Sequence, residues 1–199
     1  MSRAAQPPAG GINRKIVIYV TLAVVAIAAI VAVALANRVS QTSLTTNPQA
    51  ALKVGSKAPT FSVSTNAGPF DLATVSSPVF LEVFATWCPQ CQHEVPVVDA
   101  LAQHYVGKVA FVGVTGSPYG VDSSSPENQA DVDAWVQKLN VTYPVAFDAN
   151  LTVANQYLQG GYPTIVLIGV DKTIHYIGSG ELAPQVLAKA IDAVLSSHS

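Results

Sequence analysis

The chain has 199 residues, which is enough for one ordinary domain and an additional segment. Half of the residues are hydrophobic and only 11% are charged, an apolar excess for a soluble domain that points to a segment in which it is concentrated. Three of the ten basic residues and none of the twelve acidic residues precede residue 16, so the remainder carries a net charge of about −5, which gives no support to nucleic-acid binding.

Residues 16–36 concentrate this apolar excess, with no charged residue in the segment. A helix of this length reaches roughly 32 Å, about the thickness of a bilayer's hydrocarbon core. Arg3, Arg14 and Lys15 precede the segment, where no acidic residue occurs. Basic residues that flank a membrane span remain on its cytoplasmic side. We therefore expect residues 1–15 to form a cytoplasmic arm, the apolar segment to span the lipid bilayer, and the rest of the chain to be extracytoplasmic.

A cleaved signal peptide is the alternative for the same segment. Ala34-Leu35-Ala36 has the small-x-small form that signal peptidase accepts. The apolar stretch is longer than the roughly 7–15 residues of a signal peptide's hydrophobic region, which favours a retained anchor. Either arrangement delivers the following domain outside the cytoplasm.

Residues 37–52 are polar, rich in serine and threonine, and without helical or alternating periodicity, so we predict a linker there. The domain proper is expected over residues 53–199. Its first part, residues 54–75, carries glycine, proline and asparagine around the alternating stretch 61–65. This pattern predicts a small N-terminal hairpin.

The apolar run 79–85 predicts a buried strand that leads almost directly to Cys88. Proline suits the first turn of a helix, because its missing N–H would have no partner there. Pro89 therefore predicts a helix that begins after Cys88 and extends to about residue 105, with a kink at Pro96. Cys88 then lies at a strand-to-helix junction.

Strands and helices alternate through the rest of the chain. The segment Ser125-Pro126-Glu127 is typical of a helix start, with serine as N-cap and proline at the first position. Together the patterns predict an α/β fold with a mixed central sheet flanked by helices. The remaining expected elements are strands at 109–115 and 143–147, helices at 125–139 and just before 160, a hairpin at 164–169 and 174–177, and a closing helix at 183–196.

The chain contains only two cysteines, in the sequence Cys88-Pro89-Gln90-Cys91. A disulfide across so short a loop constrains little unfolded-state entropy, so the pair indicates redox chemistry. Unpaired N–H groups at a helix N-terminus stabilise a thiolate, and we expect Cys88, exposed at this terminus, to be the nucleophile. Cys91, one turn deeper, is expected to resolve the mixed disulfide. No cofactor beyond the disulfide of this pair is expected.

A metal site is the alternative use of paired cysteines. Structural zinc takes four ligands, commonly from two such pairs or from one pair and two closely spaced histidines. The sequence has one pair and no such histidines near it, so we expect no metal.

Three stretches of the sequence resemble a known family. They are Phe84-Ala85-Thr86-Trp87-Cys88-Pro89-Gln90-Cys91, Gly55-x-x-Ala58-Pro59-x-Phe61 and Gly161-Tyr162-Pro163-Thr164. Together they are similar to the membrane-anchored thioredoxin-like reductases of the TlpA/ResA group, which serve cytochrome c maturation. The resemblance covers residues from about 54 to 199. It implies a thioredoxin-like fold, thiol-disulfide oxidoreductase activity on protein thiols and disulfides, apocytochrome c as a partner, and a membrane thiol donor.

The resemblance also implies roles for three further residues. Pro163 becomes a cis-proline beside the cysteines that leaves a neighbouring peptide group free for a substrate chain, the alternative being an ordinary trans proline. Glu82 matches the buried acid of thioredoxins, so its pKa should be raised and it should exchange a proton with Cys91. The alternative is that the Glu82 side chain points to a polar edge of the domain and has no chemical role. Glu94 matches an acidic residue near the active site of the reductase group, the alternative being a solvated helix charge.

Four residues around the cysteines are expected to contact the substrate. Trp87 and Tyr162 are expected to wall the cysteine surface, although an aromatic residue at either position could simply pack. Pro89 and Gln90 separate the cysteines, and this dipeptide strongly influences the redox potential. The motif therefore leaves open whether the protein is a reductant or an oxidant.

Two other functions remain open. Thioredoxin-fold copper-binding assembly factors are also membrane-anchored, but they use a CxxxC pair with a distal histidine. A peroxiredoxin is suggested by Thr86-Trp87-Cys88, but Glu82 stands where the P-x-x-x-T-x-x-C pattern has its proline. We therefore favour disulfide exchange with protein cysteines, and the resemblance to the TlpA/ResA group implies that the protein acts as a reductant.

Overall fold

The structure is a computed structural model of the chain that describes Ile18 and residues 52–197. The predicted cytoplasmic arm, transmembrane anchor and linker lie outside the described residues, except for Ile18 and Leu52. Within the described residues, no helix is both long enough and apolar enough to span a bilayer. The strands and helices of residues 52–197 belong to one compact unit, Ala50–Ser199.

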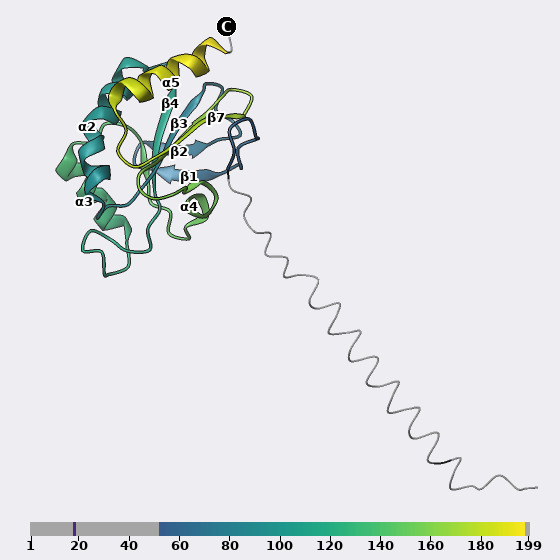
Figure 1. Ribbon diagram of the computed structural model, residues 1–199. Helices are drawn as coiled ribbons and strands as arrows, with labels where there is room; N and C mark the ends of the chain where they lie inside the picture. The colour runs from purple at the N-terminus through teal and green to yellow at the C-terminus, as the bar shows by residue number, and fades with distance from the viewer. Residues whose placement is uncertain (1–17, 19–51, 198–199) are drawn as a thin grey trace, which may run out of the picture. The chain divides into compact units, whose positions relative to one another are not determined.

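The described residues form one mixed sheet of seven strands (Figure 1). The strands are β1 Ser62–Thr65, β2 Gly68–Asp71, β3 Val79–Phe84, β4 Ala110–Thr115, β5 Val145–Ala146, β6 Thr164–Ile168 and β7 Ile174–Ser179. Their order is β2-β1-β5-β4-β3-β6-β7, with β3 parallel to β4 and antiparallel to β6. The predicted mixed α/β sheet and the predicted N-terminal hairpin, formed by β1 and β2, are confirmed.

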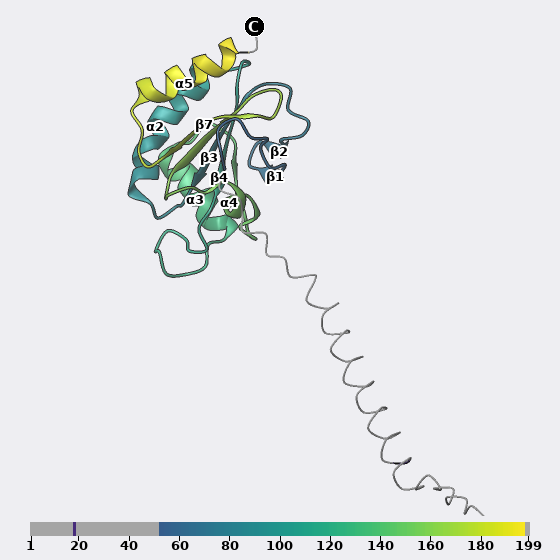
Figure 2. The same ribbon diagram turned by 45° about the vertical axis from the view of Figure 1, so that its right-hand side comes forward.

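Four helices accompany the sheet in the described part of Ala50–Ser199. They are α2 Pro89–His104, α3 Gln129–Leu139, α4 Thr152–Tyr157 and α5 Pro184–Ser196. Figures 1 and 2 show α2 and α5 side by side along one face of the sheet. Helix α2 begins at Pro89, as predicted, and continues through Pro96.

The predicted start of α3 is wrong. Asn128, and not Ser125, is its N-cap, and a reciprocal pair of hydrogen bonds between Asn128 and Asp131 forms a capping box. The preceding residues close a loop instead, because Pro126 bridges to Tyr119 and the N–H of Glu127 donates to the carbonyl of Pro118. This difference moves Glu127 from a helix surface into the interior.

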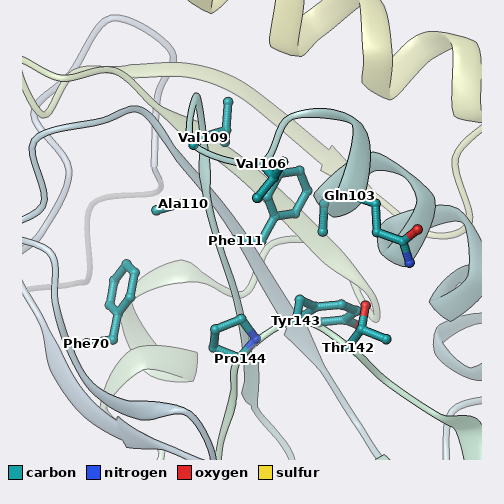
Figure 3. A pocket seen from close by; sticks show the side chains of 11 residues that line it. Phe70, Gln103, Val106, Val109, Ala110, Phe111, Thr142, Tyr143 and Pro144 are labelled. Atoms are coloured by element: carbon teal, nitrogen blue, oxygen red, sulfur yellow. The ribbon is translucent and has the colours of Figure 1, made fainter.

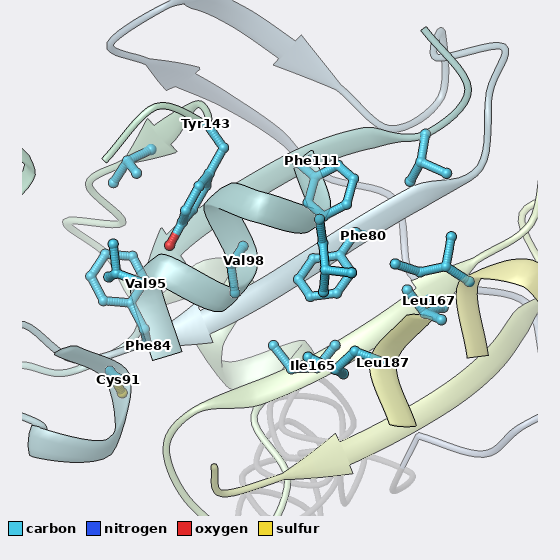
Figure 4. Close-up of a cluster of buried hydrophobic side chains, with 14 of the residues drawn as sticks. Phe80, Phe84, Cys91, Val95, Val98, Phe111, Tyr143, Ile165, Leu167 and Leu187 are labelled. Carbon is cyan, nitrogen blue, oxygen red and sulfur yellow. The ribbon is translucent and has the colours of Figure 1, made fainter. Parts of the chain in front are cut away.

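Strand β3 is buried on both faces, and its alternate residues enter different cores. Phe80 and Phe84 belong to a cluster with residues of α2, α3 and α5 (Figure 4). Leu81 and Val83 belong to a second cluster with residues of α4 and the N-terminal hairpin. By the same alternation, Glu82 lies on the face that α2 covers.

Candidate active site

Cys88 is the N-cap residue of α2, with Pro89 at the first helical position. The N–H of Cys91 donates a hydrogen bond to Sγ of Cys88 over 3.3 Å. The same sulfur lies 3.5 Å from Oε1 of Gln90 and 3.8 Å from the carbonyl oxygen of Tyr162. The helix terminus therefore supplies a donor that can stabilise negative charge on Cys88, as predicted from Pro89.

The prediction that Cys88 is exposed is wrong. Its accessible fraction is 2% and that of Cys91 is 0%, and both are free thiols. The Gln90 side chain and the carbonyl of Tyr162 lie beside the sulfur of Cys88. Because Gln90 is exposed and Tyr162 is half-buried, a partner must displace surface groups to reach the sulfur.

Cys91 lies in the hydrophobic cluster that α2 shares with β3 (Figure 4). Burial raises the pKa of the Cys91 thiol far above its ordinary value, and the charge of Glu82 raises this pKa further. Cys91 therefore needs a proton acceptor before it can act as a thiolate.

The loop before β6 completes the cysteine site. The Tyr162–Pro163 peptide bond is cis, as predicted, and Pro163 is buried. The carbonyl oxygen of Tyr162 faces Cys88, so residues far apart in the sequence meet at one sulfur.

Trp87 and Tyr162 form an aromatic pair beside Cys88, with ring centroids 5.7 Å apart in an edge-to-face arrangement. The Trp87 indole N–H donates to Oγ of Ser117, and the Tyr162 hydroxyl donates to the carbonyl of Gly116. A Cβ at Gly116 would lie 2.5 Å from Cγ1 of Val83, so only glycine fits there. The loop after β4 thus anchors both rings, a contribution that the sequence motifs did not indicate.

Glu82 is completely buried in β3, so the alternative of a polar edge is wrong. Its register partners are Gly113 on β4 and Ile165 on β6. The hydroxyl of Tyr143 donates to Oε2 of Glu82 over 2.8 Å. Burial raises the pKa of Glu82 to about 8, against the lowering effect of the Tyr143 hydrogen bond, and the predicted direction of this shift is confirmed.

Glu94 is also buried, with 1% of its surface exposed, so it is not a solvated helix charge. Its Oε1 accepts a hydrogen bond from the N–H of Leu182, which precedes α5. Burial raises the pKa of Glu94 to about 7, opposed by this hydrogen bond and assisted by the charge of Glu181. Glu94 therefore ties α2 to the loop before α5 and can change its charge near neutral pH.

A third buried carboxyl, Glu127, was not expected from the sequence. Its Oε1 accepts a hydrogen bond from the Thr86 hydroxyl over 2.8 Å, directly before the Trp87-Cys88 turn. Burial raises the pKa of Glu127, while hydrogen bonds from Thr86 and Thr115 oppose the change. The sequence pattern marked Glu127 only as part of a helix start, and its contact with Thr86 spans 41 positions of the chain.

The sequence matches the AhpC/TSA family over residues 54–177, which is more than half of the chain. The chain belongs to the AhpC/TSA family. Several curated relatives carry names that describe an activity. The thiol-disulfide oxidoreductase ResA of Geobacillus thermodenitrificans is 25% identical over 146 residues, covering 72% of this chain and 79% of the relative. The thiol:disulfide interchange protein DsbE of Escherichia coli K12 is 27% identical over 160 residues, covering 77% and 80%.

A solved structure confirms the fold. The putative thiol:disulfide interchange protein DsbE from Chlorobium tepidum superimposes with a TM-score of 0.64 at 23% identity, covering 73% of this chain and 99% of that one. The domain therefore has the predicted thioredoxin-like fold. The names of the relatives add the activity to this fold: the protein is an enzyme, a thiol-disulfide oxidoreductase of the ResA/DsbE type.

Proposed function

We propose that the enzyme exchanges disulfides with protein cysteines through Cys88 and Cys91, and that it works as a reductant in cytochrome c maturation. The observation that carries the proposal is the position of Cys88 as N-cap of α2, where the N–H of Cys91 donates to its sulfur. The reductant role rests on the resemblance to the TlpA/ResA group and on the relatives named ResA and DsbE.

In the proposed reaction the Cys88 thiolate attacks a disulfide of the partner protein and forms a mixed disulfide. Cys91 loses its proton to Glu82 and attacks the Cys88 sulfur. The bond between Cys88 and the partner breaks, the Cys88–Cys91 disulfide forms, and the partner leaves with both its cysteines reduced. A membrane thiol donor then returns two electrons and two protons to the pair.

The partner is proposed to meet Cys88 between the two aromatic side chains and the cis-proline loop. The rings of Trp87 and Tyr162 pair beside Cys88, and Pro89 and Gln90 are the exposed residues that follow it. Pro163 supports this surface from the loop before β6, and Glu94 supports it from α2, where it binds the N–H of Leu182 in the loop before α5. An unfolded partner such as apocytochrome c, whose cysteines are accessible, suits a sulfur that is itself nearly covered.

The proposal is tested by offering three oxidants separately to the reduced full chain. The oxidants are a disulfide-bonded peptide with the CxxC pattern of an apocytochrome, hydrogen peroxide, and Cu(II). We expect one peptide disulfide to be reduced for each Cys88–Cys91 pair oxidised, as measured by mass spectrometry. Peroxide-dependent turnover without peptide reduction would support a peroxiredoxin. Stoichiometric copper binding without peptide reduction would support a copper assembly factor.

The location of the enzyme is a separate proposal. We propose that residues 16–36 anchor it in the cytoplasmic membrane, with the arm 1–15 inside and the catalytic domain outside, because the apolar length and the basic N-terminal flank agree. A protease added to intact spheroplasts should then digest the catalytic domain. Protection of the domain in spheroplasts, together with digestion in inverted vesicles, would contradict this topology.

A further inference from the structure

The two carboxyl oxygens of Glu82 have different surroundings. Oε2 accepts the hydrogen bond from the Tyr143 hydroxyl over 2.8 Å. Oε1 is buried and has no hydrogen-bond partner among the residues that the structure describes. A buried oxygen without a partner is costly, and a catalytic role is one of the reasons for which such an atom is retained. Oε1 is therefore the carboxyl oxygen that has no competing donor among the described residues.

The fold holds Tyr143 in the position that this contact needs. A Cβ at Gly113, the neighbour of Glu82 on β4, would lie 3.1 Å from Cε2 of Tyr143 and 3.3 Å from Cε1 of Phe84. Glycine thus leaves the space that the tyrosine ring fills. Figure 4 shows the Tyr143 hydroxyl directed toward Val95 and Phe84, on the side of the cluster that contains Cys91.

Besides its contact with Glu82, Tyr143 also borders a cavity. The cavity has a volume of about 480 Å³, and residues from the end of α2 and the start of β4 line it as well (Figure 3). Since Cys88 follows the opposite end of β3, which runs parallel to β4, this cavity is remote from the cysteine surface. The hydroxyl of Tyr143 nevertheless has its hydrogen bond in the interior, with Glu82.

The groups that act on Glu82 come from two directions. Helix α2 contributes the thiol of Cys91 and the carboxyls of Glu94 and Asp99, and the charges of both carboxyls disfavour a charge on Glu82. On the neighbouring strands, Gly113 and Ile165 carry no charge. Tyr143 is the group whose hydrogen bond favours the ionised carboxylate.

We propose that Tyr143 is a positioning residue for the resolving step: its hydroxyl fixes Oε2 of Glu82 and so turns Oε1 toward the proton of the Cys91 thiol. The inference rests on the proposed function of the cysteine pair. In the step, the Cys91 S–H bond breaks and its proton passes to Oε1, while the sulfur keeps the electron pair and attacks Cys88. The partner's sulfur leaves as a thiolate and is protonated by water.

The test is the pH profile of the resolving step in Tyr143→Phe. The full-length reduced enzyme is mixed with a disulfide-bonded peptide, quenched with acid at intervals, and the decay of the mixed disulfide is followed by mass spectrometry. Without the hydroxyl, the ionised form of Glu82 loses a charge-assisted hydrogen bond, so the midpoint of the profile should move up by about one pH unit. Well below the midpoint, resolution should slow about tenfold.

Two controls separate positioning from a general structural effect. Tyr105→Phe removes another tyrosine hydroxyl that donates to a carboxylate, that of Asp192 on α5, and should leave the midpoint unchanged. In a Glu82→Gln background, Tyr143→Phe should change the resolution rate less than about twofold, because the group that it acts on is gone.

The outcomes distinguish this inference from the proposed function. Normal mixed-disulfide formation with an unchanged pH midpoint in Tyr143→Phe, or an equal effect in the Glu82→Gln background, would overturn the role of Tyr143 and leave the function standing. Absence of any mixed disulfide in the wild-type enzyme would overturn the function first. Thermal unfolding of Tyr143→Phe, measured in parallel, establishes that the folded variant was assayed.

Discussion

Replacing Cys91 with serine should leave the partner covalently attached to Cys88 and lower turnover by about 10³-fold or more. Cys88 keeps its position at the N-terminus of α2 and can still attack. Resolution then depends on an external thiol, which cannot match the effective molarity of a thiol held in the same active site. The trapped adduct is measured by non-reducing electrophoresis and by mass spectrometry, and it should disappear with a reductant.

The matched control is Cys88→Ser. Its remaining thiol, Cys91, has no accessible surface and a strongly raised pKa, so it should capture little or no partner. Equal capture by the two serine variants would contradict the assignment of Cys88 as the nucleophile. The trapped proteins from cells should include apocytochromes c, or haem-ligation factors, and a membrane thiol donor. A broad set of unrelated secreted proteins would instead favour a general oxidant or isomerase.

Replacing Glu82 with glutamine should change how stability depends on pH. The pKa of Glu82 is about 8 in the folded protein and 4.5 in its ordinary state, so the folded chain holds a proton that the unfolded chain has lost between these values. The stability that Glu82 contributes is therefore fully present below pH 4.5 and is lost as the pH rises through 8. Glutamine carries no such charge. Relative to wild type, the variant should gain up to roughly 5 kcal/mol in free energy of unfolding across this window.

Denaturant unfolding of the reduced protein at a series of pH values measures this difference. The same exchange at the exposed Glu181 serves as the control and should show no comparable trend. In activity assays, Glu82→Gln should slow the resolving step by about 10²-fold, because the proton acceptor of Cys91 is absent. A stability difference that stays constant with pH would show that Glu82 is already ionised in the folded state.

The position of the two cysteines between a buried strand and a helix could be predicted from residues close to them in the sequence. Pro89 has a fixed φ and no N–H, so it suits the first position of the helix that follows Cys88. The alternating stretch of the hairpin and the apolar run of β3 are equally local signals. The start of α3 could also have been placed better, because the capping box between Asn128 and Asp131 spans three positions.

Contacts between distant parts of the chain could not be predicted from sequence neighbours. The hydrogen bond from Tyr143 to Glu82 joins residues 61 positions apart, and the one from Thr86 to Glu127 joins residues 41 apart. Periodicity reports which face of an element is apolar, but not which distant side chain fills the space beside it. The near-complete burial of Cys88 likewise depends in part on the carbonyl of Tyr162 in the loop before β6, 74 positions away. Sequence neighbours thus place the two thiols at a helix terminus, whereas long-range packing sets their accessibility and supplies the buried carboxyls.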